Sequence, residues 1–163
     1  FNDIDNNYLY MRSETIQGLS YFLRRDGHIQ ALDTQPKIPV VKPTWALISE
    51  KDQADGWHIS KSLDCQCLAS DSAGHLWVLV YKQGGDANPG LEAQVWQYDP
   101  ISQKRLRRIK LKSAAEKIVI TRGKNPYLAA LSSGVDVYKL STGEFVRNIG
   151  GFNSYHFLLY ASK

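Results

Sequence analysis

The stretch VDVYKLSTGEFVRNI, residues 135–149, decides the fold, because nearly the same layout occurs forty residues earlier as VWQYDPISQKRLRRI, residues 95–109. In each copy a short apolar-alternating run ends at Tyr, a polar turn follows, and a second run ends at Ile. Alternation with a period of two places one face of a strand on a core, so each copy predicts a β-hairpin. The identical positions are Val95/Val135, Tyr98/Tyr138, Arg107/Arg147 and Ile109/Ile149.

The repeated layout extends beyond these two hairpins. Two further strands are predicted upstream of the later hairpin within 116–131, and residues 62–83 supply the same part upstream of the earlier one. Residues 8–34 give a third copy, with a hairpin turn at Asp26-Gly27. Repeats of about 40–45 residues with four strands each are typical of a β-propeller. An all-β sandwich is the alternative, but its hairpins need not recur at a fixed period.

The sequence therefore predicts an all-β protein with three four-stranded propeller blades, at about 8–49, 62–111 and 115–150, and a closing strand at about 154–161. Three blades and one strand do not close a ring, because propellers usually have four to eight blades. We expect residues 1–163 to be the C-terminal part of one larger propeller domain. The last strand would then pair with the other end of the polypeptide.

Composition places the chain among soluble globular domains. It has 163 residues, of which 43% are hydrophobic and 22% charged, and a formal net charge of +4. This balance excludes a disordered chain and is too weakly basic for a dedicated nucleic-acid binder. No run approaches the roughly 20 apolar residues of a membrane-spanning helix. The sequence opens FNDIDNNYLYM, which is neither an initiator Met nor a signal peptide, so we expect a removed leader or a longer polypeptide.

Several segments, taken in order, resemble the large (heavy) subunit of the quinone-dependent amine dehydrogenases, of the methylamine and aromatic amine type. The segment Ala54-Asp55-Gly56-Trp57 matches an Ala-Asp-Gly-Trp element of that family, and an apolar strand follows at 76–80. In that family a strand and a Leu-Asp pair are followed by a Thr-Gly-Glu turn and a second strand, and parts of this order occur twice in the present sequence. The other matched residues are Tyr98, Asp99, Ser141, Thr142, Gly143, Glu144, Gly27, Ile29, Leu32 and Asp33.

The resemblance implies a seven-bladed propeller in a periplasmic heterotetramer that oxidises primary amines to aldehydes with ammonia release. This chain would bind no cofactor, because in that family a small partner subunit holds tryptophan tryptophylquinone. Electrons would pass to a small blue-copper protein. No catalytic residue is assigned to this chain, and residues 1–163 alone would be inactive. The alternative is a non-enzymatic β-propeller that acts as a protein-interaction module.

Trp57 and His58 are the candidate partner-contact residues. They lie in a loop before a blade, where functional residues are frequent, and Trp is enriched at interface hot spots. An equally open interpretation is that Trp57 packs one blade against the next. For His58, general-base chemistry would need a partner within hydrogen-bond reach, and the sequence identifies none.

The remaining reactive residue types indicate no metal site. Cys65 and Cys67 are expected to be small buried apolar residues, although an oxidising periplasm would allow them to pair. A zinc site would need more ligands at finger-like spacing. His28 and His75 follow glycines and are expected to be exposed turn residues, and His156 completes a scattered set.

The run KRLRRIKLK, residues 104–112, holds six basic residues in nine. Two interpretations are open: a patch for an acidic partner or nucleic acid, and a solvated outer edge strand. We favour the edge strand, because no aromatic residues are interleaved and charged edges block strand addition. The glycine-rich segment at 83–92 precedes a strand instead of a helix, so it is expected to be an ordinary or partner-facing loop.

Overall fold

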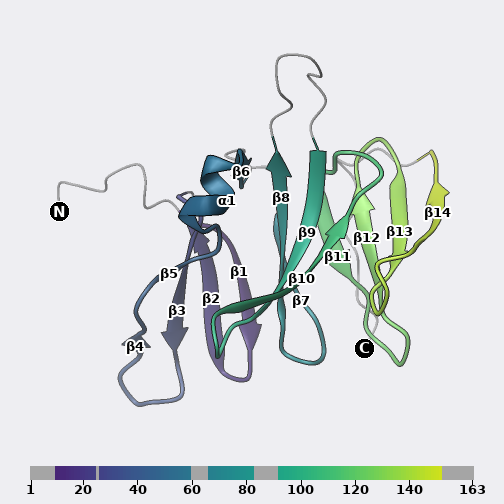
Figure 1. Ribbon diagram of the computed structural model, residues 1–163. Helices are drawn as coiled ribbons and strands as arrows, with labels where there is room; N and C mark the ends of the chain where they lie inside the picture. Colours follow the sequence, from purple (N-terminus) through teal and green to yellow (C-terminus); the bar gives the residue numbers. More distant parts are fainter. Residues whose placement is uncertain (1–9, 25, 60–65, 83–91, 152–163) are drawn as a thin grey trace.

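The computed structural model describes residues 10–24, 26–59, 66–82 and 92–151, which form three antiparallel sheets that stand side by side (Figure 1). We call them sheets A, B and C in chain order. Sheet A contains β1 (Tyr10–Ile16), β2 (Leu19–Arg24), β3 (His28–Asp33), β4 (Val40–Val41) and β5 (Trp45–Ala46). Sheet B contains β6 (Trp57–His58), β7 (Leu68–Ser70), β8 (Leu76–Lys82), β9 (Glu92–Asp99) and β10 (Lys104–Lys110). Sheet C contains β11 (Lys117–Ile120), β12 (Tyr127–Leu131), β13 (Val135–Lys139) and β14 (Phe145–Ile149).

Each sheet follows chain order from its inner strand to its outer strand. One end position is split in two of the sheets: the outer one in sheet A, where β4 and β5 both pair β3, and the inner one in sheet B, where β6 and β7 both pair β8. The inner strands lie next to one another, since β1 contacts β7 and β7 contacts β11. The amide of Ile118 donates to the Gln66 carbonyl at 3.0 Å, and this hydrogen bond joins sheets B and C at their inner strands. Consecutive four-stranded meanders around shared inner strands form part of a β-propeller, which confirms the predicted fold class.

The two hairpins that share a sequence layout also share a strand register. Val95 pairs Ile109 in sheet B, and Val135 pairs Ile149 in sheet C. Both outer strands carry a bulge three residues before the shared Ile, at Leu106 and Val146 respectively. The two bulged side chains are 51% and 43% exposed. The forty-residue offset therefore preserves even the irregular positions of the outer strands.

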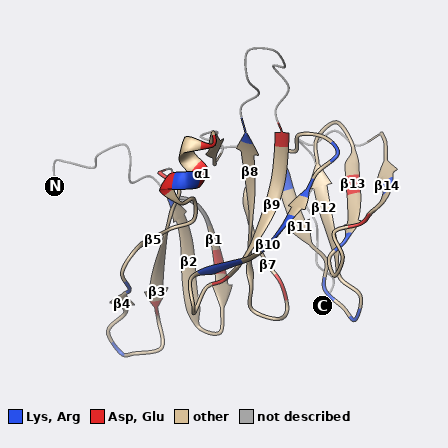
Figure 2. Ribbon diagram, in the orientation of Figure 1, with Lys and Arg blue, Asp and Glu red and all other residues tan. Residues whose placement is uncertain are grey.

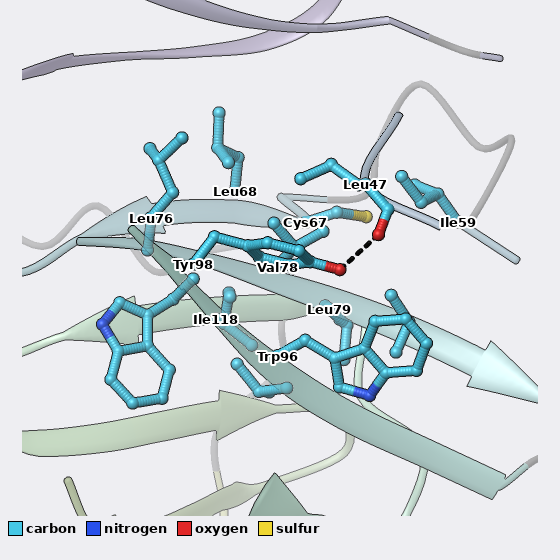
Figure 3. Close-up of a cluster of buried hydrophobic side chains, with 14 of the residues drawn as sticks. Leu47, Ile59, Cys67, Leu68, Leu76, Val78, Leu79, Trp96, Tyr98 and Ile118 are labelled. Atoms are coloured by element: carbon cyan, nitrogen blue, oxygen red, sulfur yellow. Dashed lines mark hydrogen bonds between the residues drawn. The ribbon is translucent and has the colours of Figure 1, made fainter. Parts of the chain in front are cut away.

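The shared tyrosines join each sheet to the segment that precedes it. The Tyr98 hydroxyl donates to the carbonyl of Leu47, which lies between sheets A and B (Figure 3). The Tyr138 hydroxyl accepts from the amide of Lys112, between sheets B and C, at 2.8 Å. Burial raises the pKa of both hydroxyls, which keeps them protonated. Identity at this position thus has a physical reason, because each hydroxyl satisfies a backbone group at a sheet boundary.

The core is centred on sheet B. Six of the seven residues of β8 are buried, as expected of a strand covered on both faces. Trp77 and Trp96 are the largest fully buried side chains, and aliphatic side chains of sheets A, B and C pack around them. Figure 3 shows Leu68, Leu76 and Val78 on one side of this cluster and Ile118 of sheet C on the other. Sheet B is therefore the layer against which both neighbouring sheets pack.

The helix α1 (Glu50–Ala54) connects sheets A and B. Ser49 caps it, since its hydroxyl accepts from the Asp52 amide at 3.1 Å and donates to the Asp52 carboxylate at 2.6 Å. The sequence interpretation did not include this helix. In the part of the chain that the structure describes, no helical segment has the length and hydropathy of a membrane span.

Sequence expectations for the two cysteines and for the closing strand can be compared with the structure. Cys67 is fully buried, as expected, and it is disulfide-bonded, which is the alternative that the sequence left open. Cys65 lies outside the described residues. The closing strand predicted at 154–161 and His156 also lie outside them.

Candidate functional site

A pocket opens between sheets A and B at the end of the molecule opposite α1. Its volume is about 240 Å³. Three chain turns form it: the β1–β2 turn, the β7–β8 turn and the start of the β9–β10 turn. We call it the A–B pocket, and its lining residues are Ile16, Gln17, Leu19, Tyr21, Ala73, Gly74, His75, Asp99, Pro100 and Ile101.

Left-handed backbone positions fix the first two turns. Gln17 has φ 49° and Gly18 φ 82°, as a two-residue hairpin turn of the primed type requires. Gly74 has φ 87°, and a Cβ there would lie 3.3 Å from Cγ2 of Ile16. The two turns therefore pack directly on each other, which holds their side chains in a fixed relation across the sheet boundary.

Asp71 anchors the β7–β8 turn from within. Its carboxylate accepts from the amide of His75 at 3.0 Å, the His75 ring Nδ1 at 3.1 Å and the indole Nε1 of Trp77 at 2.8 Å. Burial raises the pKa of the Asp71 carboxyl, but the hydrogen bonds outweigh it and the net pKa is lowered. An ionised carboxylate only accepts, so the His75 Nδ1 carries the proton in this hydrogen bond.

Asp99 and Tyr21 face each other across the sheet boundary. Hydrogen bonds from the Ser102 hydroxyl and the Ile101 amide, at 2.6 and 2.9 Å, lower the pKa of the Asp99 carboxyl. Burial, and then the negative charge of Asp99, raise the pKa of the Tyr21 hydroxyl. At neutral pH the A–B pocket therefore holds a carboxylate beside a protonated phenol.

The outer rim of the A–B pocket is apolar. Ile101 follows Asp99-Pro100 in the β9–β10 turn and is 79% exposed, the most exposed large apolar side chain among the described residues. Ile16 and Leu19 are partly buried against the core from the other side. The pocket thus combines a projecting apolar residue, apolar walls and polar groups on three turns.

Trp57 and His58, the predicted partner-contact residues, lie in β6, on α1's side of the molecule and away from the A–B pocket. Trp57 is 6% exposed and packs on Trp96, with ring centroids 5.3 Å apart. This geometry favours the interpretation in which Trp57 is a core residue. The sequence placed that packing between two blades, whereas the neighbour Trp96 belongs to the same sheet as Trp57. His58 is half-buried, and its Nδ1 lies 3.2 Å from the Gly56 carbonyl. A partner contact at these two residues stays a prediction.

The basic run at 104–112 contains two classes of side chain. Figure 2 shows β10 as a basic outer strand of sheet B. Lys104 and Lys110 are exposed, as expected of a solvated edge. Arg105 and Arg108 instead form ion pairs with the buried Asp52, at 2.7 and 2.8 Å.

The same two guanidiniums stack over Trp96, at 4.3 and 4.5 Å from its ring centroid. Arg107 lies over the Trp77 ring at 5.0 Å and donates to the carbonyls of Leu140 and, at 2.6 Å, Ser141 of the next sheet. The solvated-edge interpretation is therefore wrong for Arg105 and Arg107, which are half-buried, whereas Arg108 is exposed at the edge and still pairs with Asp52.

The remaining residues that the sequence singled out are two histidines and the glycine-rich segment. His75 is half-buried and paired with Asp71, so its interpretation as an exposed turn residue is wrong. His28 pairs with Asp26 at 3.1 Å. Most of the segment 83–92 lies outside the described residues. Within the part of the chain that the structure describes, no three His, Cys, Asp or Glu side chains gather as metal ligands would.

Sequence reasoning missed the A–B pocket, because its residues come from three turns up to 85 positions apart. One signal was present: Asp99-Pro100-Ile101 puts a large apolar residue at the tip of a turn. Such positions are normally polar.

Comparison with known proteins bears on the fold. No protein-family model matches the chain, and no curated protein matches it either. The solved structure titled "Structure of U3-55K" is similar at 13% identity and a TM-score of 0.52, over 88% of this chain and 42% of that one. The "Crystal structure of RRP9 WD40 repeats" is similar at 15% identity and a TM-score of 0.51, over 90% and 42%. The chain thus spans less than half the length of these structures, and its fold is that of part of a β-propeller.

Proposed function

We propose that the chain is part of a non-enzymatic β-propeller whose turns dock a protein partner. The observation that carries the proposal is the A–B pocket with Ile101 at its rim, 79% exposed beside a cavity of about 240 Å³. Its turns are fixed by internal hydrogen bonds, so a partner would meet a preformed surface. Preformed surfaces lose little conformational entropy on binding.

Site-specific photo-crosslinking in cells tests this function. A benzophenone amino acid at position 101 should yield one recurrent cross-linked polypeptide. The same probe at Ser133, in the exposed β12–β13 turn at the other end of the molecule, should not. The variant Ile101→Ala should weaken binding of the identified partner roughly tenfold, as truncation of an interface anchor does. Equal cross-linking at both positions would refute a specific docking face.

The second candidate function is the one that the sequence resemblance suggests, the scaffold subunit of a periplasmic amine dehydrogenase. It is favoured by the colinear match that includes Ala54-Asp55-Gly56-Trp57. In that case the small quinone-bearing subunit should cross-link to a probe at Ala54, an exposed residue of α1, near Trp57 and His58. The purified assembly should also reduce an electron-acceptor dye when a primary amine is added. A purified assembly without amine-dependent dye reduction would count against this candidate.

A further inference from the structure

The size of the A–B pocket limits what it holds. Its volume of about 240 Å³ is below the roughly 300–1,000 Å³ typical of small-molecule sites. A single long side chain of a docked polypeptide is of a suitable size. Because the pocket opens beside the exposed Ile101, the backbone of such a polypeptide could lie along the turn while one side chain enters.

The charge of the A–B pocket comes from one carboxylate, that of Asp99, and among the described residues no lysine or arginine lines the pocket. Hydrogen bonds from Ser102 and Ile101 lower the pKa of this carboxyl, so it is ionised at neutral pH. The Gln17 side chain adds an amide that can both accept and donate, and the Tyr21 hydroxyl adds a donor. The Asp99 carboxylate therefore favours a positively charged group and disfavours an anion.

The apolar walls of the A–B pocket further restrict the kind of side chain that it can bind. Ile16, Leu19 and Ile101 line the same pocket as the Asp99 carboxylate. Lysine and arginine side chains have the same order of parts, an apolar stem followed by a charged head. We propose that the A–B pocket binds the side chain of a lysine or arginine presented by a partner polypeptide. This inference rests on the proposed docking function and specifies its chemistry.

Methyl-detected NMR titration of the full-length protein tests the inference with four probes: capped lysine, capped arginine, capped norleucine and capped glutamate. Lysine and arginine should shift the methyl signals of Ala73 and Ile101 with a dissociation constant on the order of 1 mM. The signal of Ile118, which is fully buried, should stay in place. Norleucine, which has the stem without the charge, should bind at least about tenfold more weakly. Equal binding of norleucine, or tighter binding of glutamate, would overturn the inference.

Two substitutions locate the effect. Asp99→Asn should weaken lysine binding roughly tenfold and leave norleucine unchanged, because it removes charge while an amide oxygen still accepts from Ile101. The matched control Asp55→Asn removes the same charge at an exposed position on α1's side and should change neither. An unchanged lysine affinity in Asp99→Asn would refute the assignment. If cross-linking at position 101 succeeds while lysine does not bind, the docking function stands and only this inference fails.

Discussion

At the residue scale, one buried carboxylate organises the junction of α1 and sheet B. Asp52 is 5% exposed and accepts from Ser49, Arg105 and Arg108. Burial raises the pKa of the Asp52 carboxyl, but the hydrogen bonds from Arg105 and Ser49 and the charges of Arg105 and Arg108 lower it overall. The carboxylate is therefore charged at neutral pH and compensated from three sides.

Asp52→Ala should lower the free energy of unfolding by about 2–3 kcal/mol. Breaking a buried pair usually costs about 3–5 kcal/mol, and this value is lower because both guanidiniums keep partial contact with water. Urea denaturation of the full-length protein measures it. The control Asp55→Ala changes an exposed residue at the end of the same helix and should cost less than about 0.5 kcal/mol. Equal effects of the two substitutions would contradict the assigned role.

Asp71 should make stability depend on pH. Its pKa is lower in the folded protein than the unfolded value of about 3.9, so its contribution is complete above about pH 4 and is lost as pH falls through the folded pKa. Asp71→Asn should cost about 1–3 kcal/mol at pH 7, because an amide replaces an acceptor of four hydrogen bonds. Below pH 4 this difference should shrink. Denaturation midpoints from pH 2 to 7 would show it, and a constant difference would exclude the linkage.

At the element scale, the β13–β14 turn of sheet C packs against sheet B. Gly143 has φ 76°, and a Cβ there would lie 3.2 Å from Cγ1 of Ile109 in sheet B. Gly143→Ala should therefore cost about 1–2 kcal/mol from backbone strain and more from the contact. Gly151→Ala is the matched control, because Gly151 has φ 83° with open space around it. Thermal melts would compare the two variants, and equal shifts in melting temperature would show that the contact is unimportant.

The strands were largely predictable from sequence, because a period of two and a forty-residue offset are local patterns. They predicted the hairpins at 95–109 and 135–149, both of which the structure contains. The helix α1 was missed although Ser49 and Asp52 have the spacing of a capping pair. The ion pairs of Arg105 and Arg108 were missed, because their partner Asp52 lies more than fifty residues away in sequence. Local pattern does not reveal which charged residues of an edge strand find a buried partner.

At the scale of the whole molecule, stability should be greatest in sheet B. It is packed between the two other described sheets, and six residues of β8 are buried. In repeat-built folds each unit is stabilised mainly by its neighbours. Amide hydrogen exchange should therefore be slowest in β8 and β9 and faster in β2 and β12. Mass spectrometry of peptic peptides measures this order, and slower exchange in β12 than in β8 would contradict it.

The A–B pocket also belongs to this scale, which is why sequence reasoning did not find it. Its walls exist only when the β1–β2, β7–β8 and β9–β10 turns meet. No composition or spacing within one turn indicates that meeting. The fold class could be inferred from repetition, whereas the site depends on how two repeats are set against each other.

The shape of the outer strands of the three sheets affects whether copies of the molecule can pair edge to edge at high concentration. Sheet A ends in two-residue strands, while β10 and β14 are interrupted at Leu106 and Val146, and β10 is also strongly basic. An incoming chain would find no long straight ladder of free backbone groups to extend, and at β10 it would meet like charges. Such borders disfavour the edge-to-edge strand addition through which fibrils grow.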